Sequence, residues 1–343
     1  MEYRMLGRSG TVISAQTLGT MTFGSEADEE TSAAMLTAFV EAGGTCIDTA
    51  DAYGPGRSEE IIGRWLAAHP TDAAQVVLAT KARFAMGPGL NDLGLSRRHL
   101  QRALDGSLRR LGVDHVELYQ MHAWDDYTPV EETLRFLDDA VASGRISYYG
   151  FSNYLGWQLT KAVHLARAHG WAAPATLQPQ YNLLARDIEL EIVPAALDAG
   201  MGLLPWSPLG GGWLTGKYQR GVTPTGATRL GENPDRRMES WADRNEDERT
   251  WRVLDVVRDV AEAHGVPMSH VALAWVAAQP GVSSVILGAR TLEQLTDNLR
   301  ATDLRLSPEE LATLDEVSAP RVQSYPYGWA GQQQRARALT PHG

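Results

Sequence analysis

Polar side chains follow three successive apolar segments in the first part of this chain of 343 residues. They are Asp48 and Tyr53 after the first segment, Lys81 at the end of the second and His122 at the end of the third. A tyrosine hydroxyl keeps its proton at neutral pH, and a nearby lysine ammonium lowers its pKa. An aspartate keeps such a lysine charged, and a histidine can donate a hydrogen bond to a carbonyl oxygen. Together the four could activate a carbonyl group, although each alone is more often a cap, turn or packing residue.

These residues meet only if the segments that carry them are neighbouring parallel strands. Short apolar segments predict strands at 13–21, 46–50, 76–81, 116–122, 146–153, 175–182, 202–208 and 283–288. Segments with helical spacing alternate with them, at 28–43, 58–69, 96–112, 129–144, 155–169, 188–199 and 291–300. Strand–helix units with mostly short connections predict a closed α/β structure, the (β/α)8 TIM barrel, whose strand ends share one rim.

Several segments depart from this alternation. Residues 3–12 predict an N-terminal β-hairpin that covers the floor of the barrel, and residues 209–247 form a long loop after strand 7. Extra C-terminal helices are expected because residues 250–278 contain two helical segments in place of one. The tail from 319 to 343 has no clear period. We expect a single domain over 1–343, with a core of about 13–318.

Composition narrows the classes of partner. The chain has 42 acidic and 31 basic residues and a net charge of −11, which argues against a nucleic-acid partner. The single cysteine, Cys46, excludes an intrachain disulfide and allows a reducing compartment. No signal peptide or membrane-spanning stretch is apparent, so we expect a cytoplasmic protein without membrane contact. No metal site is expected, because His122, Asp125 and Asp126 lack a converging spacing. A homo-oligomer is compatible with the sequence.

Along nearly its whole length the chain resembles the aldo-keto reductase superfamily, in the branch that contains bacterial reductases and potassium-channel beta subunits. The motifs that carry the resemblance are LGTMTFG (18–24), IDTADAYG (47–54), ATK (79–81), YQMH (119–122), GFSN (150–153), LQPQYNLL (177–184), PWSPLGGGWLTGKY (205–218) and GARTLEQLTDNL (288–299). The resemblance implies a catalytic tetrad of Asp48, Tyr53, Lys81 and His122 in a barrel that reduces aldehydes or ketones. Tyr53 would be the general acid.

The resemblance also implies a nicotinamide cofactor. No GxGxxG motif follows a strand, and GPGLND (87–92) fails at its third position, so a Rossmann phosphate loop is not expected. Instead, Ser152, Asn153 and Gln178 would hold the nicotinamide carboxamide, with Trp206 stacked under the ring. Amide side chains supply the paired donors and acceptors that a carboxamide needs. From the residues alone, Trp206 could also be core and Asn153 a helix cap.

The phosphates of the cofactor have candidate ligands in two motifs. PLGGGWLTGK resembles the loop that folds over the pyrophosphate, with Lys217 supplying charge. Many members bind the 2′-phosphate through a lysine–serine pair and an arginine, which Gly288, Ala289 and Gln294 replace here. Arg290 is then the best available phosphate ligand, so NADP is favoured and NAD is possible. The full set of expected cofactor contacts is Gly19, Thr20, Met21, Asp48, Ser152, Asn153, Gln178, Trp206, Ser207, Pro208, Leu209, Gly211, Lys217, Gly288, Arg290, Gln294 and Asn298.

The rim loops supply aromatic residues to a substrate pocket, namely Phe23, Phe84, Trp124, Trp213 and members of the tail at 325–329. They predict a small-molecule carbonyl substrate that is apolar, planar or a sugar. Three functions compete. The first is an NADPH-dependent carbonyl reductase, and the second a cofactor-holding redox sensor or regulatory subunit with slow turnover. The third is a Schiff-base aldolase with Lys81 as nucleophile, against which the cofactor-type residues argue.

Overall fold

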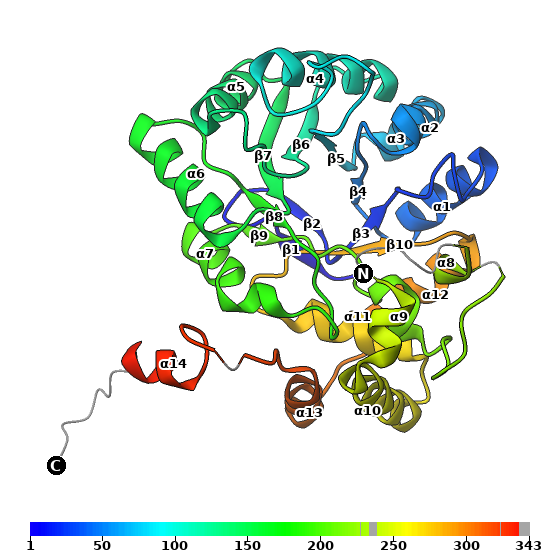
Figure 1. The fold of residues 1–343 in the computed structure, drawn as a ribbon. Coiled ribbons are helices and arrows are strands. Elements are labelled where there is room, and N and C mark those ends of the chain that lie inside the picture. Colours follow the sequence, from blue (N-terminus) through cyan, green and yellow to red (C-terminus); the bar gives the residue numbers. More distant parts are fainter. Residues whose placement is uncertain (227, 233–238, 323, 336–343) are drawn as a thin grey trace.

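The structure is a computed structural model that describes residues 1–226, 228–232, 239–322 and 324–335. Its centre is a ring of parallel strands surrounded by helices (Figure 1). The strands in sheet order are β10 (Val285–Gly288), β3 (Gln16–Gly19), β4 (Cys46–Asp48), β5 (Val77–Ala82), β6 (Val116–Met121), β7 (Ile146–Ser152), β8 (Thr176–Gln178) and β9 (Gly202–Leu203). Each strand pairs in parallel with the next.

The two ends of this sheet meet and close it into a barrel. The amide of Ser283 donates to the carbonyl of Leu203 at 2.9 Å, and that of Ile286 donates to Pro205 at 3.0 Å. These bonds give both edges of the sheet a partner. The predicted (β/α)8 barrel is confirmed.

Helices cover the outside of the ring (Figure 1). The helices that follow strands β3 to β10 in turn are α1 (Glu29–Glu41), α2 (Arg57–Ala68), α4 (Arg97–Leu111), α5 (Val130–Ala142), α6 (Gly156–His169), α7 (Ile192–Ala199), α10 (Glu248–His264) with α11 (Met268–Ala278), and α12 (Leu292–Leu299). In α4 the Ser96 side chain accepts from the amide of His99, and Gly112 ends the helix at φ 68°. Leu100 and Leu104 are completely buried. Such local caps and apolar stripes explain why these boundaries are readable from sequence.

The amino-terminal end of the barrel is closed by the expected hairpin. Strands β1 (Tyr3–Met5) and β2 (Val12–Ser14) pair antiparallel. Leu6 and Ile13 are completely buried and pack in one cluster with Cys46 and Leu118. The hairpin does not cover the opposite end of the barrel, where the carboxyl ends of the strands lie and where a site is expected.

In its described residues, the long segment after β9, which was expected to be a loop, has short helices. It contains η3 (Gly210–Thr215), α8 (Arg229–Glu232) and α9 (Trp241–Glu246). Trp213 is completely buried, stacks on Trp241 with ring centroids 5.2 Å apart and meets Trp251 edge to face. This aromatic cluster ties the segment to α10.

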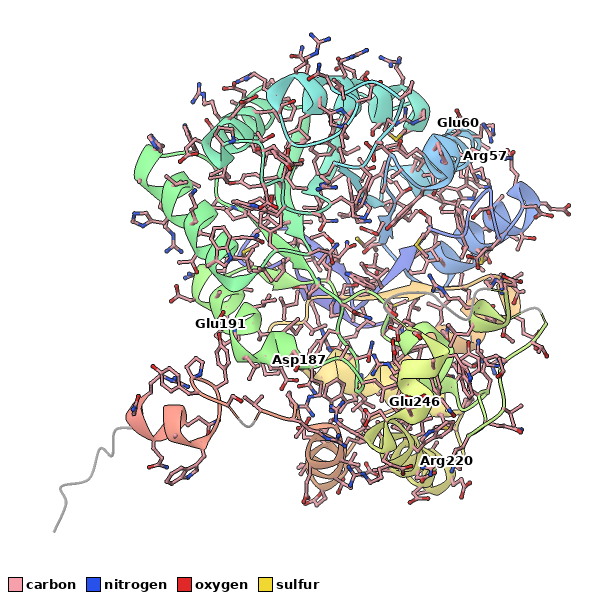
Figure 2. All side chains as sticks on the ribbon, in the orientation of Figure 1. Arg57, Glu60, Asp187, Glu191, Arg220 and Glu246 are labelled. Carbon is pink, nitrogen blue, oxygen red and sulfur yellow. The ribbon has the colours of Figure 1, made fainter. Side chains whose placement is uncertain are left out.

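The tail also has structure that its sequence did not indicate. After α13 (Pro308–Ser318), α14 (Trp329–Arg335) stands away from the barrel in Figure 1. The tail contacts the barrel through the Tyr327 hydroxyl, which donates to Glu191, a residue labelled in Figure 2. The remaining tail residues, 323 and 336–343, lie outside the described part of the chain. Among the helices of the described ranges, none has the length and apolar character needed to cross a membrane.

Candidate active site

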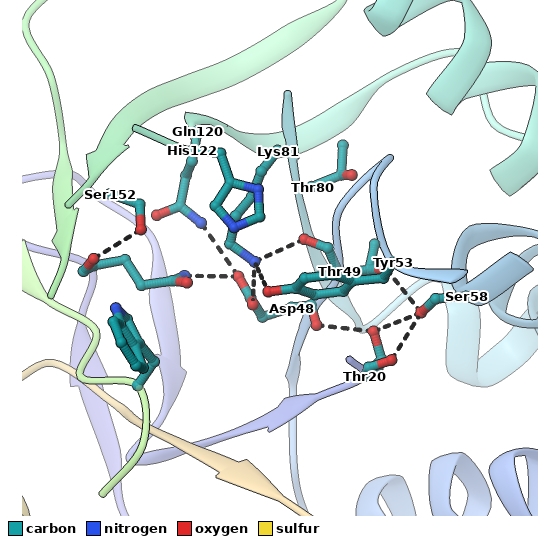
Figure 3. Close-up of polar contacts among 12 residues, drawn as sticks. Thr20, Asp48, Thr49, Tyr53, Ser58, Thr80, Lys81, Gln120, His122 and Ser152 are labelled. Carbon is teal, nitrogen blue, oxygen red and sulfur yellow. Dashed lines mark hydrogen bonds and ion pairs between the residues drawn. The ribbon is translucent and has the colours of Figure 1, made fainter. Parts of the chain in front are cut away.

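Lys81 is the centre of a buried polar cluster at the carboxyl ends of β4 and β5 (Figure 3). Its ammonium donates to Asp48 Oδ2 at 2.5 Å, to the Thr49 carbonyl oxygen at 2.8 Å and to the Tyr53 hydroxyl at 3.2 Å. The Lys81 side chain is 0% exposed. Three of the four predicted tetrad residues are thus in direct contact.

These three bonds show that the Tyr53 hydroxyl proton does not point at Lys81. A lysine ammonium has three N–H donors and no acceptor, and all three donors of Lys81 are in use. The Tyr53 oxygen must therefore accept from Lys81, and its own proton points elsewhere. Tyr53 is partly exposed to solvent, so its hydroxyl can present that proton to a bound molecule.

Opposing effects act on the pKa of Tyr53. Burial raises the pKa of Tyr53 above its usual value, while Lys81 opposes the shift and Asp48 adds to it. Lys81 thus lowers the pKa of Tyr53, as expected, through its charge and its hydrogen bond, but the effect of burial is larger. Burial alone would lower the pKa of Lys81. Asp48 and Tyr53 outweigh burial and raise this pKa above its usual value, so the amine stays charged.

His122 completes the cluster as a neutral imidazole. Its ring meets the Tyr53 ring edge to face, with centroids 5.8 Å apart, and meets Phe84 at 4.6 Å. Burial, helped by the charges of Lys81 and Arg83, lowers the pKa of His122 to about 2. A neutral imidazole carries one N–H donor. The buried Nδ1 atom has no hydrogen-bond partner within the described residues, so any donation to a ligand would come from the other ring nitrogen.

The second carboxylate oxygen of Asp48 is held by two amides that lie deeper in the barrel. Gln178 donates to Asp48 Oδ1 at 2.8 Å, and Gln120 donates to the same oxygen at 3.2 Å (Figure 3). Gln120 was not predicted. A signal was present, since it stands two residues before His122 in a strand and therefore points to the same face of the sheet.

The residues expected around a nicotinamide ring do lie together. Ser152 donates from its hydroxyl to the backbone carbonyl of Gln178 at 2.9 Å, and Trp206 donates from its indole nitrogen to Asn153 Oδ1 at 3.1 Å. The Asn153 amide in turn donates to the backbone carbonyl of His122 at 2.9 Å. Asn153 and Ser207 have positive φ angles of 58° and 53°. Such conformations are uncommon for non-glycine residues and often occur at binding sites.

The glycine-rich loop after Trp206 has the backbone freedom expected of a phosphate loop. Gly210, Gly211 and Gly212 have positive φ angles of 56°, 64° and 97°. Successive left-handed residues are compatible only with glycine and can turn several amides toward an anion. Partial burial, together with Arg290 and Arg229, lowers the pKa of Lys217. Three cations therefore gather beside this loop in a protein of net negative charge.

Arg290, the expected 2′-phosphate ligand, is already paired with carboxylates. Its Nε atom lies 2.7 Å from Glu26, which follows β3, and its Nη2 atom contacts Glu232 of α8. The side-chain oxygen of Gln294, another expected cofactor contact, accepts from the Arg290 amide at 2.9 Å. Asn298 is only 7% exposed. Glu26 and Glu232 would therefore compete with a phosphate for Arg290.

Other expected cofactor residues lie along the same rim. Gly19 pairs in register with Asp48, and the Thr20 hydroxyl donates to the Asp48 carbonyl at 3.0 Å. Thr20 is completely buried and Met21 is 37% exposed. Pro208 is buried, Leu209 is half-buried and Gly288 is exposed at the end of β10. Their contacts to a cofactor remain predictions.

The expected substrate pocket is only partly assembled from the aromatic residues named for it. Phe84 is 38% exposed beside His122, and Trp124 meets Tyr154 and Trp157 edge to face at 5.3 and 5.4 Å. Phe23 and Trp213, in contrast, are both 0% exposed. They were expected at the pocket and instead belong to the hydrophobic core.

Comparison with known proteins identifies a family for this chain. The sequence model of a protein family, described as "Aldo/keto reductase family", matches residues 17–319. The chain is 39% identical to "Uncharacterized oxidoreductase YrpG" of Bacillus subtilis (strain 168), covering 92% of this chain and 96% of that protein. It is 38% identical to "Probable voltage-gated potassium channel subunit beta" of Oryza sativa subsp. japonica, covering 95% and 100%. It is 33% identical to "Versiconal hemiacetal acetate reductase" of Aspergillus parasiticus, covering 94% and 98%.

Proposed function

The chain belongs to the aldo/keto reductase family, and from this premise we propose that it reduces aldehydes or ketones with NADPH, with Tyr53 as general acid. The single observation that carries the proposal is the use of all three Lys81 donors, one of them on the Tyr53 oxygen. This arrangement leaves the tyrosine proton for a ligand and keeps a positive charge beside the oxygen that loses it.

The residues around the cluster support a nicotinamide dinucleotide. Gln178 uses its amide nitrogen on Asp48, so its side-chain oxygen is the atom that could accept from a carboxamide. Trp206 is half-buried and offers a flat ring surface for stacking. Lys217, with Arg229 and Arg290 near it, provides the positive charge that a pyrophosphate needs. Bound NADPH would supply a hydride to the carbonyl carbon of the substrate.

The protein's own residues would handle the proton and the orientation of the substrate. His122, neutral at physiological pH, donates a hydrogen bond to the carbonyl oxygen and holds it near Tyr53. Tyr53 gives its proton to that oxygen as negative charge develops there. Lys81 stabilises the resulting tyrosinate, and Asp48 keeps Lys81 charged and in place. Phe84 and Trp124 favour a planar, apolar carbonyl compound as substrate.

The test combines cofactor binding with turnover. Quenching of tryptophan fluorescence gives the Kd of NADPH, and loss of NADPH absorbance with 4-nitrobenzaldehyde gives kcat. Tyr53→Phe should lower kcat by at least about 100-fold and leave the Kd of NADPH unchanged, because it removes the proton donor alone. The matched control is Tyr127→Phe, since Tyr127 is 97% exposed. A Tyr53→Phe protein with wild-type kcat would show that Tyr53 is not the acid.

The alternative function is a cofactor-holding sensor or regulatory subunit with slow turnover. The observation that favours it is the bridge from Glu26 through Arg290 to Glu232, which joins the segment after β9 to the barrel and could slow cofactor release. A single rapid turnover followed by a much slower steady state would support this alternative. Sustained turnover at the rate of the first cycle would support the reductase.

A further inference from the structure

We propose that Gln120 is a positioning residue for the reaction, which holds Asp48 so that Asp48 orients Lys81 toward Tyr53. The inference rests on the proposed function, because its effect is exerted on the proton of Tyr53. It assigns a role to a side chain that touches neither the Tyr53 hydroxyl nor Lys81 through any hydrogen bond of the described residues.

The two oxygens of Asp48 have separate partners. Oδ2 accepts from Lys81 at 2.5 Å, whereas Oδ1 accepts from Gln178 at 2.8 Å and from Gln120 at 3.2 Å. A carboxylate bound on both oxygens is restrained about its χ angles, and the second donor on Oδ1, from Gln120, restrains Asp48 more than Gln178 does alone. Gln120 is completely buried, so water is not at hand to replace its amide.

Gln120 is itself held by a row of residues across the barrel. In register, Lys81 of β5 is opposite Gln120 of β6, Gln120 is opposite Gly150 of β7, and Gly150 is opposite Thr176 of β8. The Thr176 hydroxyl donates to the Gln120 side-chain oxygen at 3.4 Å, across the position of Gly150. This bond leaves the Gln120 amide nitrogen directed at Asp48.

Gly150 makes that contact across the intervening strand possible. A Cβ atom built on Gly150 would lie 2.0 Å from the Thr176 hydroxyl oxygen. Any side chain at Gly150 would therefore displace Thr176 from Gln120. A glycine inside a strand costs stability, and close approach of neighbouring groups is a common reason for one. The register of these four residues, Lys81, Gln120, Gly150 and Thr176, therefore places the Gln120 amide within hydrogen-bonding distance of Asp48.

Gln120 differs from Gln178 in one respect that matters for the reaction. Gln178 is expected to contact the cofactor through its side-chain oxygen, so its substitution would change cofactor affinity as well as the support of Asp48. Gln120 lies two residues inside the strand from His122 and holds Asp48 independently of the cofactor. Loss of Gln120 should therefore lower kcat and leave cofactor affinity unchanged.

Two substitutions test this role. Gln120→Met keeps the length of the side chain and removes the donor, and should lower kcat by about tenfold or more, because a hydrogen bond to a charged group is lost. The KM of the carbonyl substrate and the Kd of NADPH should stay within about twofold. Gln120→Glu replaces the donor by a carboxyl group that can donate only when protonated. Its kcat should be near that of the wild type at low pH and should fall as pH rises and the carboxyl ionises against Asp48.

Two substitutions of Thr176 test whether its hydroxyl holds Gln120 in place. Thr176→Ser retains the hydroxyl and should behave like the wild type, whereas Thr176→Val removes it and should lower kcat in the same direction as Gln120→Met. A fall in Tm without a change in kcat or in its pH profile would identify Gln120 as a structural residue only and overturn the proposal. Wild-type kcat in Gln120→Met would overturn it as well.

An activity-independent measurement separates this inference from the proposed function. Ultraviolet difference absorbance between the wild type and Tyr53→Phe reports the ionisation of Tyr53 without substrate. Gln120→Met should change the pH at which Tyr53 ionises, because Asp48 loses one of the two amides on Oδ1 and holds Lys81 less firmly against the hydroxyl. An unchanged Tyr53 titration would overturn the positioning role even if the wild type reduces carbonyl compounds. A changed titration in a protein that reduces none would overturn only the proposed function.

Discussion

The Nζ atom of Lys81 lies 2.5 Å from Asp48 Oδ2, and neither side chain is open to solvent. Each charge has lost its hydration and depends on the other, and the remaining N–H groups and oxygen of the pair are bound to protein. Removing two charges from water is costly, so an isolated pair of this kind does not by itself stabilise a fold. Its presence at the rim of the barrel is consistent with the reaction proposed for Tyr53.

The first prediction separates the stability of this pair from its chemistry. Lys81→Met should destabilise the protein by about 3–5 kcal/mol, because it leaves Asp48 buried without a counter-charge. The double variant with Lys81→Met and Asp48→Asn should recover much of that loss but remain inactive. Urea unfolding and kcat measure the two effects. Activity in the double variant would contradict the assigned role of Lys81.

The second prediction concerns the pH dependence of kcat. The pKa of His122 is lowered to about 2, so His122 stays neutral from mildly acidic pH upward. The pKa of Tyr53 is raised, so Tyr53 keeps its proton throughout the neutral range. A plot of log kcat should therefore be flat from about pH 5 to about pH 9, without an inflection near the usual pKa of histidine, about 6.5. An inflection near that value that disappears in His122→Asn would contradict this prediction.

The third prediction concerns the carboxylates beside Arg290. Glu26→Gln should lower the Kd of NADPH by roughly threefold to tenfold. The Glu26 carboxylate would compete with the 2′-phosphate for Arg290, and the substitution removes its charge from this partly exposed ion pair. NADH lacks that phosphate, so its Kd should not change. Fluorescence titration at low and high salt measures both, and the gain should shrink as salt screens the charges.

The control for this effect is Glu41→Gln, which removes the same charge from an exposed position at the other end of α1. Equal changes for NADPH and NADH in Glu26→Gln would mean that Glu26 does not act through the 2′-phosphate.

The fourth prediction concerns Asp51, a buried carboxyl that the proposed reaction does not use. Neither of its oxygens has a hydrogen-bond partner within the described residues, and the side chain is completely buried. Burial and the neighbouring Glu59 raise the pKa of Asp51 from 3.8 to about 7, although Arg110 and Lys81 oppose the shift. A raised folded-state pKa means that its contribution to stability is present below about pH 4 and is lost as pH rises through about 7.

Asp51→Asn should therefore equal the wild type in stability near pH 4 and exceed it above about pH 7, by up to roughly 4 kcal/mol. Urea unfolding at several pH values measures the difference. Asp198→Asn, at an exposed position in α7, is the matched control. A stability difference that does not vary with pH would show that Asp51 is not neutral in the folded protein.

Much of the fold and part of the site could be predicted from the sequence, because they depend on local properties. The cap at Ser96 and the glycine at Gly112 mark α4, and the apolar segments mark the strands of the barrel. Strands that alternate with helices pair in parallel, so the residues at their ends meet on one rim. This is why Asp48, Tyr53 and Lys81 could be grouped before any contact was known.

The features that the sequence did not indicate arise between elements. Trp213 was expected at the pocket because it is aromatic, but it packs against Trp241 and Trp251 from other elements and is buried. Arg290 could be named as a cation, but its pairing with Glu26 depends on two loops far apart in the chain. Gln120 gave only a weak signal, since a glutamine in a strand has many possible roles.

By itself the sequence determined the order of the strands and which residue types stand at their ends, since periodicity and capping act over a few residues. Only the tertiary structure decided the direction of the Tyr53 pKa shift, the carboxylates around Arg290 and the amides that hold Asp48. These depend on desolvation and on distances of a few ångströms between strands and loops that the chain brings together only when the barrel closes.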